Sequence, residues 1–295
     1  MKVLMITGDK RFGPGHPRFD AQAGAVERLE VIFWGRGALW PKVPQGPFDV
    51  VTVQDPFWRG LFAKRVARML GARFNVQVHT DLAAQPRVRR VLASMVLRKA
   101  TSVRVVSETI KKQVLRLGVR APITVLPVFV ELERFKAIVP VPHAQKTILW
   151  VGRFEYEKDP LRALEIIQTI PEATLVMLGS GSLEQKLRTV SGRLNLPVEF
   201  PGWHEPAGYL ARADVVLSTS RHESWGQSIV EALAAGVPVV APDVGIAREA
   251  GAVVVPRSDL GRAVAQVLAS GTRGVLALSL PTKEAWAKEW AQSLV

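Results

Sequence analysis

Short apolar runs rich in Val and Ile alternate along the chain with longer stretches whose apolar residues recur every three or four positions. In the first half these runs predict six buried strands: KVLMIT, EVIFW, DVVTV, FNVQVH, SVRVV and ITVLPV. The spacing between them predicts helices near residues 20–29, 58–70, 86–99 and 107–117. Alternation of this kind is typical of a parallel sheet whose strands are joined by crossover helices.

The second half repeats the same rhythm. Its predicted strands are TILWVG, ATLVMLG, VEFPG, DVVLST, VPVVAP and AVVVP, and its predicted helices lie near 160–169, 183–192, 228–235 and 259–269. We therefore predict an α/β protein of two doubly wound, Rossmann-like domains, residues 1–141 and residues 142–280, that face each other across a ligand cleft. The segment 138–146 is the expected linker, and a helix over 281–295 could pack back on the first domain.

Charge separates the two halves more sharply than the hydrophobic pattern does. Residues 1–141 hold 24 Lys and Arg against 10 Asp and Glu, a net charge of +14, whereas residues 142–295 hold 15 against 16, a net charge of −1. Such a difference indicates that the halves meet different surroundings. The basic half could face nucleic acid, an anionic membrane or an anionic substrate.

The composition of the chain limits the kinds of site it can hold and the cellular locations that fit it. The 295 residues contain no cysteine, which excludes disulfides and thiolate metal sites. No run of eighteen apolar residues predicts a transmembrane helix, and the N-terminal residues lack the cleavage site of a signal peptide. A cytoplasmic location fits these features.

Two segments place cations or glycines directly after a predicted strand. In VGRFEYEKDP, Arg153 and Lys158 could clamp a diphosphate, Arg with its planar fork and Lys as a point charge. Ordinary solvated loop charges explain the same spacing. In LVMLGSGSLEQKL, Gly179 and Gly181 could let the backbone approach a ligand, and a tight turn without a ligand is the alternative.

A third segment, RHESWGQSIVEALAAG, combines two carboxylates with a helix start. Glu223 and Glu231 could accept hydrogen bonds from the hydroxyls of two sugars of one ligand. Between them, the amides of Gly226, Gln227 and Ser228 would open a helix, where a phosphate is stabilised. A solvated loop Glu and a capping Glu would give the same spacing.

These segments, in this order, resemble glycosyltransferase family 4 of the GT-B fold, whose pattern is roughly VGR…EKG, LxIxGxG and ExFGxxxxEAxAxGxPVV. The resemblance covers residues 145–270 and continues more weakly upstream through HTDLAAQ, SVRVVSETIKKQV and VLPVFVELERF. It implies a retaining hexosyltransferase that moves a sugar from a nucleotide-sugar donor, a UDP-, GDP- or ADP-sugar, to an acceptor sugar or lipid.

The resemblance also implies residue roles. Arg153 and Lys158 would bind the donor diphosphate, Glu223 the transferred sugar, and Glu231 the nucleotide ribose. The remaining implied donor contacts are the backbone of Gly226, Gln227, Ser228 and Gly179, and His79 near the transferred sugar. The N-terminal GG loop of the family is not intact, and its counterpart here is GPGHP with Gly13 and Gly15. Members typically need no metal, which agrees with the absence of a DxD motif, so we expect no metal and no cofactor.

The basic half holds two predicted helices that join aromatic residues to cations. On the first, Trp58, Phe62 and Met69 would share one face and Lys64 and Arg68 another. On the second, the basic stripe includes Arg87 and Arg90. Each helix is also consistent with simple packing on its sheet. Because each Lys or Arg near an anionic membrane contributes about 1 kcal/mol, several would suffice for reversible docking.

Two other functions remain open on the residues alone. A nucleic-acid-binding protein would use the basic half, although the chain has no recognisable DNA or RNA module, and we expect no nucleic-acid partner. A sugar-nucleotide epimerase of the same fold would need no acceptor, and the combination of VGRFEYEKDP with Glu223 and Glu231 favours the transferase.

Overall fold

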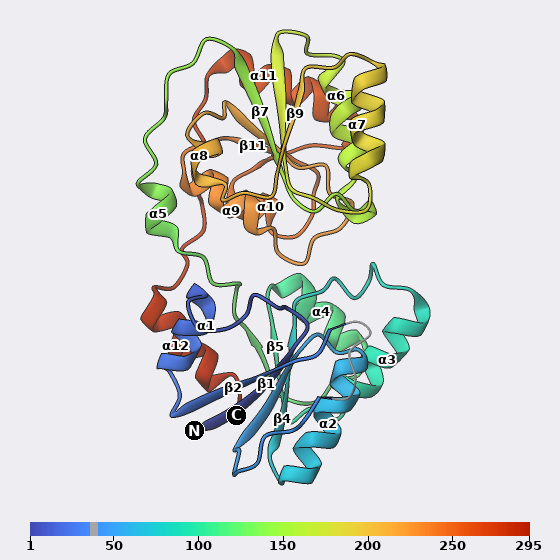
Figure 1. Ribbon diagram of the computed structural model, residues 1–295, viewed down its shortest axis with the longest axis vertical. Coiled ribbons are helices and arrows are strands. Elements are labelled where there is room, and N and C mark those ends of the chain that lie inside the picture. The colour runs from blue at the N-terminus through green and yellow to red at the C-terminus, as the bar shows by residue number, and fades with distance from the viewer. Residues whose placement is uncertain (36–40) are drawn as a thin grey trace. The chain divides into compact units, whose positions relative to one another are not determined.

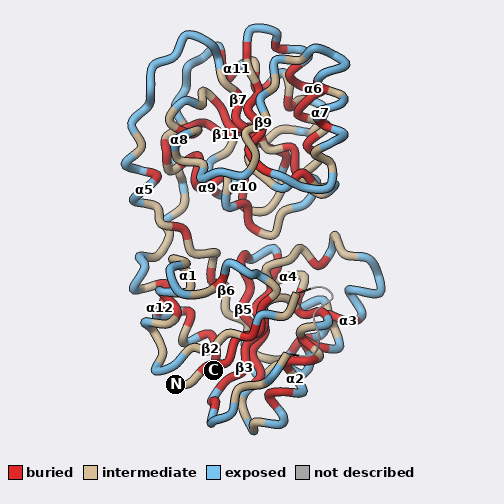
Figure 2. Tube along the Cα trace, in the orientation of Figure 1, coloured by how far each residue is buried: buried red, intermediate tan, exposed pale blue. Residues whose placement is uncertain are grey.

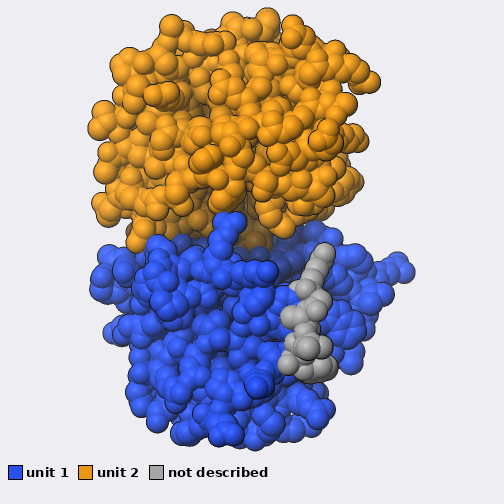
Figure 3. All heavy atoms as spheres, in the orientation of Figure 1, with its two compact units in different colours: residues 1–129, 280–295 blue, residues 130–279 orange. Residues whose placement is uncertain are grey.

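A computed structural model describes residues 1–35 and 41–295 and divides the chain into two compact units. Unit 1 comprises residues 1–129 and 280–295, and unit 2 comprises residues 130–279 (Figure 3). Unit 1 is therefore made of two segments of the chain, and the second supplies one helix, α12 (Lys283–Gln292).

Unit 1 is built on a six-stranded parallel sheet with the strand order β2-β1-β3-β4-β5-β6 (Figure 1). The apolar runs of the first half form these strands: β1 (Lys2–Thr7), β2 (Arg28–Phe33), β3 (Val50–Gln54), β4 (Arg73–Val78), β5 (Ser102–Val105) and β6 (Ile123–Val125). The crossover helices are α1 (Pro17–Gly24), α2 (Trp58–Leu70), α3 (Arg87–Leu97) and α4 (Glu108–Arg116). The direction in which successive strands are added reverses between β1 and β3. Folds of this kind bind ligands at such a switch point, beyond the carboxyl ends of the two strands.

The two faces of this sheet are covered differently. α2, α3 and α4 lie on one side, and α1 and α12 lie on the other (Figure 1). Trp286 and Trp290 of α12 are buried in a cluster with Val3, Met5 and Val50 of the sheet. The four-residue spacing of the two tryptophans gives α12 a single apolar stripe, which explains why this helix packs on the core.

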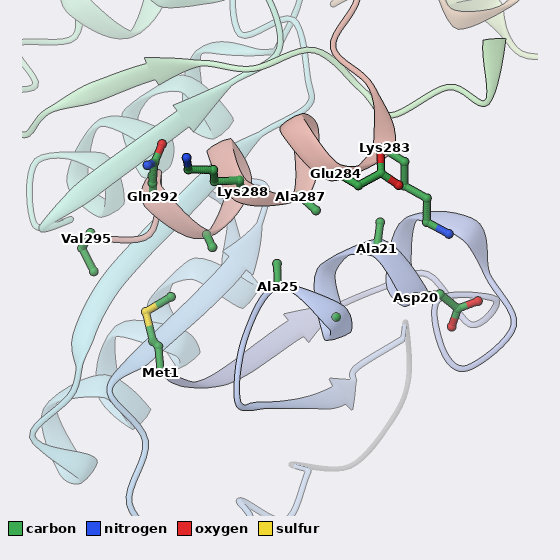
Figure 4. A pocket seen from close by; sticks show the side chains of 12 residues that line it. Met1, Asp20, Ala21, Ala25, Lys283, Glu284, Ala287, Lys288, Gln292 and Val295 are labelled. Atoms are coloured by element: carbon green, nitrogen blue, oxygen red, sulfur yellow. The ribbon is translucent and has the colours of Figure 1, made fainter. Parts of the chain in front are cut away.

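A pocket of about 620 Å³ lies where α1 and α12 meet at the outer surface of unit 1 (Figure 4). Its floor is made of small side chains from both helices, including Ala21, Ala25 and Ala287. Lys283, Glu284 and Lys288 of α12 stand at its rim.

Unit 2 repeats the architecture with the strand order β12-β11-β10-β7-β8-β9, all parallel. Its strands are β7 (Lys146–Val151), β8 (Ala173–Leu178), β9 (Val198–Gly202), β10 (Val215–Leu217), β11 (Val239–Ala241) and β12 (Val253–Val254). Its main helices are α6 (Pro160–Ile167), α7 (Glu184–Arg193), α9 (Gln227–Ala234) and α11 (Leu260–Ser270). α6, α7 and α11 share a core cluster with the sheet, and burial is concentrated in the strands of both units (Figure 2).

The predicted fold class is confirmed, because both halves are parallel α/β sheets flanked by helices. One element was predicted wrongly. The helix expected over 20–29 begins at Pro17 and ends at Gly24, and residues 28–33 form β2 instead. Pro17 stands in the first helical turn after His16, whose side chain caps the helix, and the β-rich sequence that follows pairs along β1.

Three short helices carry no periodic signal and were not predicted: α5 (Leu132–Lys136), α8 (Ala207–Leu210) and α10 (Ala247–Ala250). α5 follows the boundary of the units at Phe129 and Val130 and packs against α9 within unit 2. A helix of four or five residues buries too few side chains to impose a pattern on the sequence.

Candidate functional site

The switch point of unit 2 lies between β7 and β10, where the order of strands reverses. In doubly wound sheets the loops that leave the carboxyl ends of these two strands form the ligand crevice. β7 ends at Val151 and β10 at Leu217, so the segments 152–159 and 218–226 stand where this rule places the ligand crevice. Those segments contain Arg153, Lys158 and Glu223.

Lys158 and Glu223 meet directly at this edge. The ammonium group of Lys158 forms an ion pair with a carboxylate oxygen of Glu223, although 65 residues separate them in sequence. The hydroxyl of Ser220 donates to the same oxygen at 2.9 Å. The side chains of Lys158 and Glu223 are 19% and 11% exposed, so each is held in one position and partly desolvated.

Arg153 leaves the same loop but stands in solvent. Its side chain is 68% exposed, and its guanidinium donates to Glu157 at 2.7 Å. Glu155 instead accepts hydrogen bonds from the hydroxyl and the backbone N–H of Ser182, which lower the pKa of its carboxyl. Glu155 thus links the loop after β7 to the loop after β8, and Arg153 pairs with Glu157 in solvent.

Gly179 and Gly181 allow two backbones to pack without side chains between them. A Cβ on Gly179 would lie 1.8 Å from the carbonyl oxygen of Gly152, and a Cβ on Gly181 would lie 2.6 Å from that of Phe154. The backbone N–H of Gly179 donates to Gly202 at 2.9 Å. The positions require glycine on packing grounds alone, whether or not Gly179 contacts a ligand.

α9 begins where the sequence predicted a helix start. Gly226 precedes it with φ of 111°, in the left-handed region that favours glycine, and Gln227 and Ser228 form its first turn. The first backbone N–H groups of a helix have no partner within that helix and carry its positive dipole end. The first turn of α9 therefore offers N–H donors to an anion.

Glu231 lies one turn further along α9 and is buried, with 9% of its surface exposed. The pKa of its carboxyl is raised to about 7, chiefly by burial and also by the nearby charge of Glu205. The amide of Gln227, which donates at 2.7 Å, and the charge of Arg134 oppose this shift. A carboxylate held in so dry a place can accept hydrogen bonds that water does not contest.

A network behind the crevice involves residues that the sequence did not single out. Asp159 has φ of 47° and pairs with both Arg221 and Arg257. Arg257 also donates to the carbonyl oxygens of Thr219 and Ser220, at 2.6 and 3.0 Å. These contacts bind the loops after β7 and β10 to each other. The sequence did not single out Arg221 and Arg257 because their shared partner, Asp159, is distant from both in sequence.

His79 lies in unit 1 immediately after β4, at the carboxyl edge of the sheet. Its backbone N–H donates to Asp55 at 3.1 Å, and its ring nitrogen Nε2 lies 3.1 Å from Nη1 of Arg104. The loop with Gly13 and Gly15 follows β1 at the same edge. Gly15 has φ of 87°, and no atom lies within 4 Å of a Cβ built on either glycine.

α2 and α3 present both cations and apolar side chains to solvent. Arg68, Arg87 and Arg90 are exposed, and Lys64 is half-buried. Trp58 and Met69 are 69% and 63% exposed, but Phe62, expected on the same face, is buried at 7%. The expectation for Phe62 was wrong because its position faces the sheet and the other two do not. α3 adds an exposed apolar stripe at Val88, Val91 and Met95, which are 77%, 61% and 58% exposed.

Among residues 1–35 and 41–295, no three His, Cys, Asp or Glu side chains are grouped closely enough to hold a metal ion. In the same ranges, every helix is too short or too polar to span a bilayer.

Two family models match the chain. Residues 145–270 match the model described as "Glycosyl transferases group 1", and residues 11–128 match the "Glycosyl transferase 4-like domain". The two matches fall in the second and first halves of the chain, respectively, and the first contains Arg153, Lys158, Glu223 and Glu231.

Relatives with curated functions match parts of the chain. A GDP-mannose-dependent alpha-(1-6)-phosphatidylinositol dimannoside mannosyltransferase of Mycobacterium tuberculosis is 35% identical over 105 residues, which is 32% of this chain and 27% of the relative. The lipopolysaccharide 1,6-galactosyltransferase of Escherichia coli is 27% identical over 151 residues, 47% of this chain and 42% of the relative. The chain thus spans between about a quarter and two fifths of these relatives.

Solved structures match over the whole chain. HepE of Anabaena, determined in complex with UDP-glucose, has a TM-score of 0.75 at 17% identity and covers 100% of this chain and 95% of its own. A sucrose-phosphate synthase from Thermosynechococcus elongatus has a TM-score of 0.73 at 18% identity, with the same coverage. At these identities the likeness establishes the fold.

Proposed function

Because this chain belongs to the group 1 glycosyltransferases, family 4 of the GT-B fold, we propose that it transfers a hexose from a nucleotide-diphosphate sugar to an acceptor with retention of the anomeric configuration. One observation carries the proposal. Lys158 and Glu223 form a partly desolvated ion pair at the switch point of unit 2, in the crevice that also holds the start of α9.

The crevice fits the charge of the leaving group. In the proposed reaction the bond between the sugar and the diphosphate breaks, and negative charge grows on the diphosphate. Lys158, Arg153 and the N–H groups of Gln227 and Ser228 stabilise that charge. Preorganised donors of this kind replace the role of a metal ion, so turnover persists in EDTA.

The two carboxylates bind the two sugar rings of the donor. Glu223 accepts hydrogen bonds from hydroxyls of the transferred sugar, and Glu231 accepts them from the ribose of the nucleotide. Glu231 is suited to this task because its buried carboxyl has a pKa of about 7. Hydrogen bonds from the two ribose hydroxyls stabilise the charged form of that carboxyl. Glu223 forms an ion pair with Lys158, which holds its carboxylate in place for the sugar.

The acceptor is lipid-linked in this proposal. α3 carries Val88, Val91 and Met95 at spacings of three and four residues, all exposed, beside the exposed Arg87 and Arg90. A helix with outward apolar residues flanked by cations lies well at an anionic bilayer surface. The enzyme then works as a cytoplasmic protein bound to the inner face of the membrane. The relatives named for phosphatidylinositol dimannoside and lipopolysaccharide substrates support a membrane-associated acceptor.

The test begins with the donor. A thermal-shift series of UDP-, GDP- and ADP-sugars should raise the melting temperature for one base above the others, because a ligand that binds only the folded state stabilises it. Lys158→Met should lose most of that shift, whereas Arg188→Met, on the exposed surface of α7, should keep it. The selected donor is then incubated with short-chain lipid acceptors.

Product analysis separates the transferase from its rivals. The anomeric one-bond carbon–proton coupling of the product should equal that of the donor, as retention requires. Recovery of a new sugar nucleotide without transfer would identify an epimerase. Failure of every nucleotide sugar to bind, together with salt-sensitive binding of oligonucleotides, would favour the nucleic-acid-binding alternative.

A further inference from the structure

Arg104 is a charged residue in the middle of a buried strand. It belongs to β5, none of its surface is exposed, and it lies opposite Gln77 in the register of β4 and β5. Nη1 donates to Oε1 of Gln77 at 2.8 Å and lies 3.1 Å from Nε2 of His79. Nη2 donates to the carbonyl oxygens of Leu126 and Pro127, at 3.0 and 2.7 Å.

The contact between Arg104 and His79 determines which nitrogen of the His79 ring carries the proton. A guanidinium group has five N–H donors and no acceptor, so the nitrogen that faces it must accept. Nε2 of His79 therefore carries no proton. A neutral imidazole has one protonated nitrogen, which must then be Nδ1. Nδ1 has no hydrogen-bond partner elsewhere in the part of the chain that the structure describes, and the His79 side chain is half-buried, which leaves this N–H for a ligand.

The electrostatic surroundings keep the ring neutral. Burial lowers the pKa of His79 well below 6.5, and the positive charges of Arg104 and Arg18 lower it further. The nearest carboxylate, that of Asp55, accepts from the backbone N–H of His79 and from the hydroxyl of Thr80 at 2.7 Å, not from the ring. The two charged groups that shift the pKa of His79 are therefore both positive: Arg104 on β5 and Arg18 near the start of α1.

Arg104 cannot swing away from His79, because its other contacts are fixed. Gln77, which accepts from Arg104, donates in turn to the hydroxyl of Thr52 at 2.9 Å. The guanidinium also lies over the ring of Trp286, 5.4 Å from its centroid, and Nε1 of Trp286 donates to Pro127 at 2.9 Å. The C-terminal helix α12 therefore closes the cage that holds Arg104.

We propose that Arg104 is a positioning residue that fixes His79 as a neutral imidazole with its proton on Nδ1, so that His79 donates a hydrogen bond to a substrate oxygen and does not act as a general base. The inference rests on the proposed function only in supplying His79 with a substrate. It assigns the substrate group at His79 as a hydrogen-bond acceptor, either a sugar hydroxyl oxygen or a phosphate oxygen.

The primary test uses the wild-type chain and needs no activity. With ¹⁵N-labelled histidine, long-range proton–nitrogen correlation spectra distinguish the two neutral tautomers. The chain has five histidines, and His79→Asn assigns the signal. We expect the Nδ1–H tautomer, unchanged from pH 5 to pH 8. An Nε2–H tautomer, or titration near pH 6.5, would overturn the inference even if glycosyl transfer is found.

Variants at position 104 test the cause. Arg104→Met should give a mixture of tautomers and move the pKa of His79 toward its ordinary value. Arg104→Lys, which keeps a positive donor, should preserve the Nδ1–H form. Arg116→Met, on the exposed surface of α4, is the control and should match wild type. If the Met variant does not fold, the Lys variant and the wild-type spectrum still decide.

Kinetics test the donor role of His79. The amide nitrogen of Asn reaches the position of Nδ1, so His79→Asn should keep kcat/KM within about tenfold of wild type, whereas His79→Ala should fall roughly tenfold below Asn, the factor expected for one lost hydrogen bond. Equal rates for Asn and Ala would overturn the donor role. Absence of transfer in wild type would contradict the proposed function and leave the tautomer measurement valid.

Discussion

The ammonium group of Lys158 and the carboxylate of Glu223 form an ion pair that links the loop after β7 to the loop after β10. Both side chains are more than four fifths buried. Removing one partner of such a pair leaves the other desolvated and uncompensated, whereas removing both charges together avoids that cost. The pair is thus structural as well as chemical, and the two contributions can be separated.

The double-mutant cycle of this pair is the first prediction. Lys158→Met and Glu223→Gln should each lower the free energy of unfolding by about 1–3 kcal/mol, and the double variant should lose less than the sum. The two variants that lack Lys158 should lose transfer by about a hundredfold or more, because regained stability does not restore the charge at the diphosphate, and Glu223→Gln should lose transfer through its contact with the sugar. Urea unfolding and initial rates measure the two effects. A double variant that regains activity would mean that Lys158 serves the fold alone.

Glu231 gives a prediction about pH. Because its carboxyl has a folded pKa of about 7, above the ordinary value of 4.5, the folded state holds the proton to higher pH than the unfolded chain does. The free energy of unfolding should therefore fall as pH rises from about 4.5 to about 7 and then level off. Glu231→Gln should remove this slope and stabilise the protein at pH 8 by up to a few kcal/mol.

The same variant should bind nucleoside diphosphate more weakly, since an amide offers one acceptor oxygen to the ribose hydroxyls where the carboxylate offers two. Thermal unfolding across pH and calorimetric titration at pH 8 measure the two changes. A Gln variant that keeps the slope would show that another buried acid is responsible.

Arg153 gives the opposite combination of effects. Its side chain is 68% exposed and its pair with Glu157 is an ordinary i,i+4 contact, so Arg153→Ala should change stability by less than about 0.5 kcal/mol. Turnover should nevertheless fall about a hundredfold if the guanidinium stabilises the leaving diphosphate. Arg262→Ala removes an ion pair of a similarly exposed arginine, with Asp259 at the start of α11, and should leave both quantities unchanged. Normal turnover of the Arg153 variant at saturating donor would exclude it from the site.

The exposed cations and apolar side chains of α2 and α3 predict that the protein binds membranes through an electrostatic and an apolar contribution. The two contributions can be measured separately. Changing Lys64, Arg68, Arg87 and Arg90 to Glu should abolish binding to anionic liposomes at every salt concentration. Changing Val88, Val91 and Met95 to Ser should weaken binding at physiological salt, where the Debye length is about 8 Å, and spare it at low salt.

Liposome co-sedimentation at two salt concentrations measures membrane binding, and donor affinity is the control, because Lys158, Glu223 and Glu231 belong to unit 2 and none of the substituted residues does. If wild type fails to sediment with anionic liposomes and still glycosylates a water-soluble acceptor, the membrane has no part in the reaction.

The sequence predicted the central strands well because β1, β3, β4 and β5 are buried along nearly their whole length and read as apolar runs. β5 shows the limit of that reasoning. SVRVV is recognisable as a strand, but the pattern gives no hint that Arg104 turns inward rather than marking an exposed edge. Its acceptors lie on β4 and in the segment after β6, and only the paired sheet brings them to one place.

For the candidate site, the sequence indicated individual residues but not the contacts between them. Lys158, Glu223 and Glu231 stand out as charges beside strand ends and a helix start. The contact of Lys158 with Glu223 depends on β7 and β10 being neighbours, which no local pattern encodes. For the same reason Asp159, Arg221 and Arg257 were missed, since each is an unremarkable polar residue until three loops converge.

The return of α12 to unit 1 sets an order on the synthesis of this protein. On the ribosome, residues 1–129 are made first, but the carbonyl oxygen of Ser293, which accepts from the buried amide of Asn75 at 2.9 Å, is made only after all of unit 2. Unit 2 is continuous in sequence, so its core needs no later segment of the chain. Unit 1 must wait with Met5, Leu126 and its row of buried polar side chains uncovered, so it is the half that chaperones would meet.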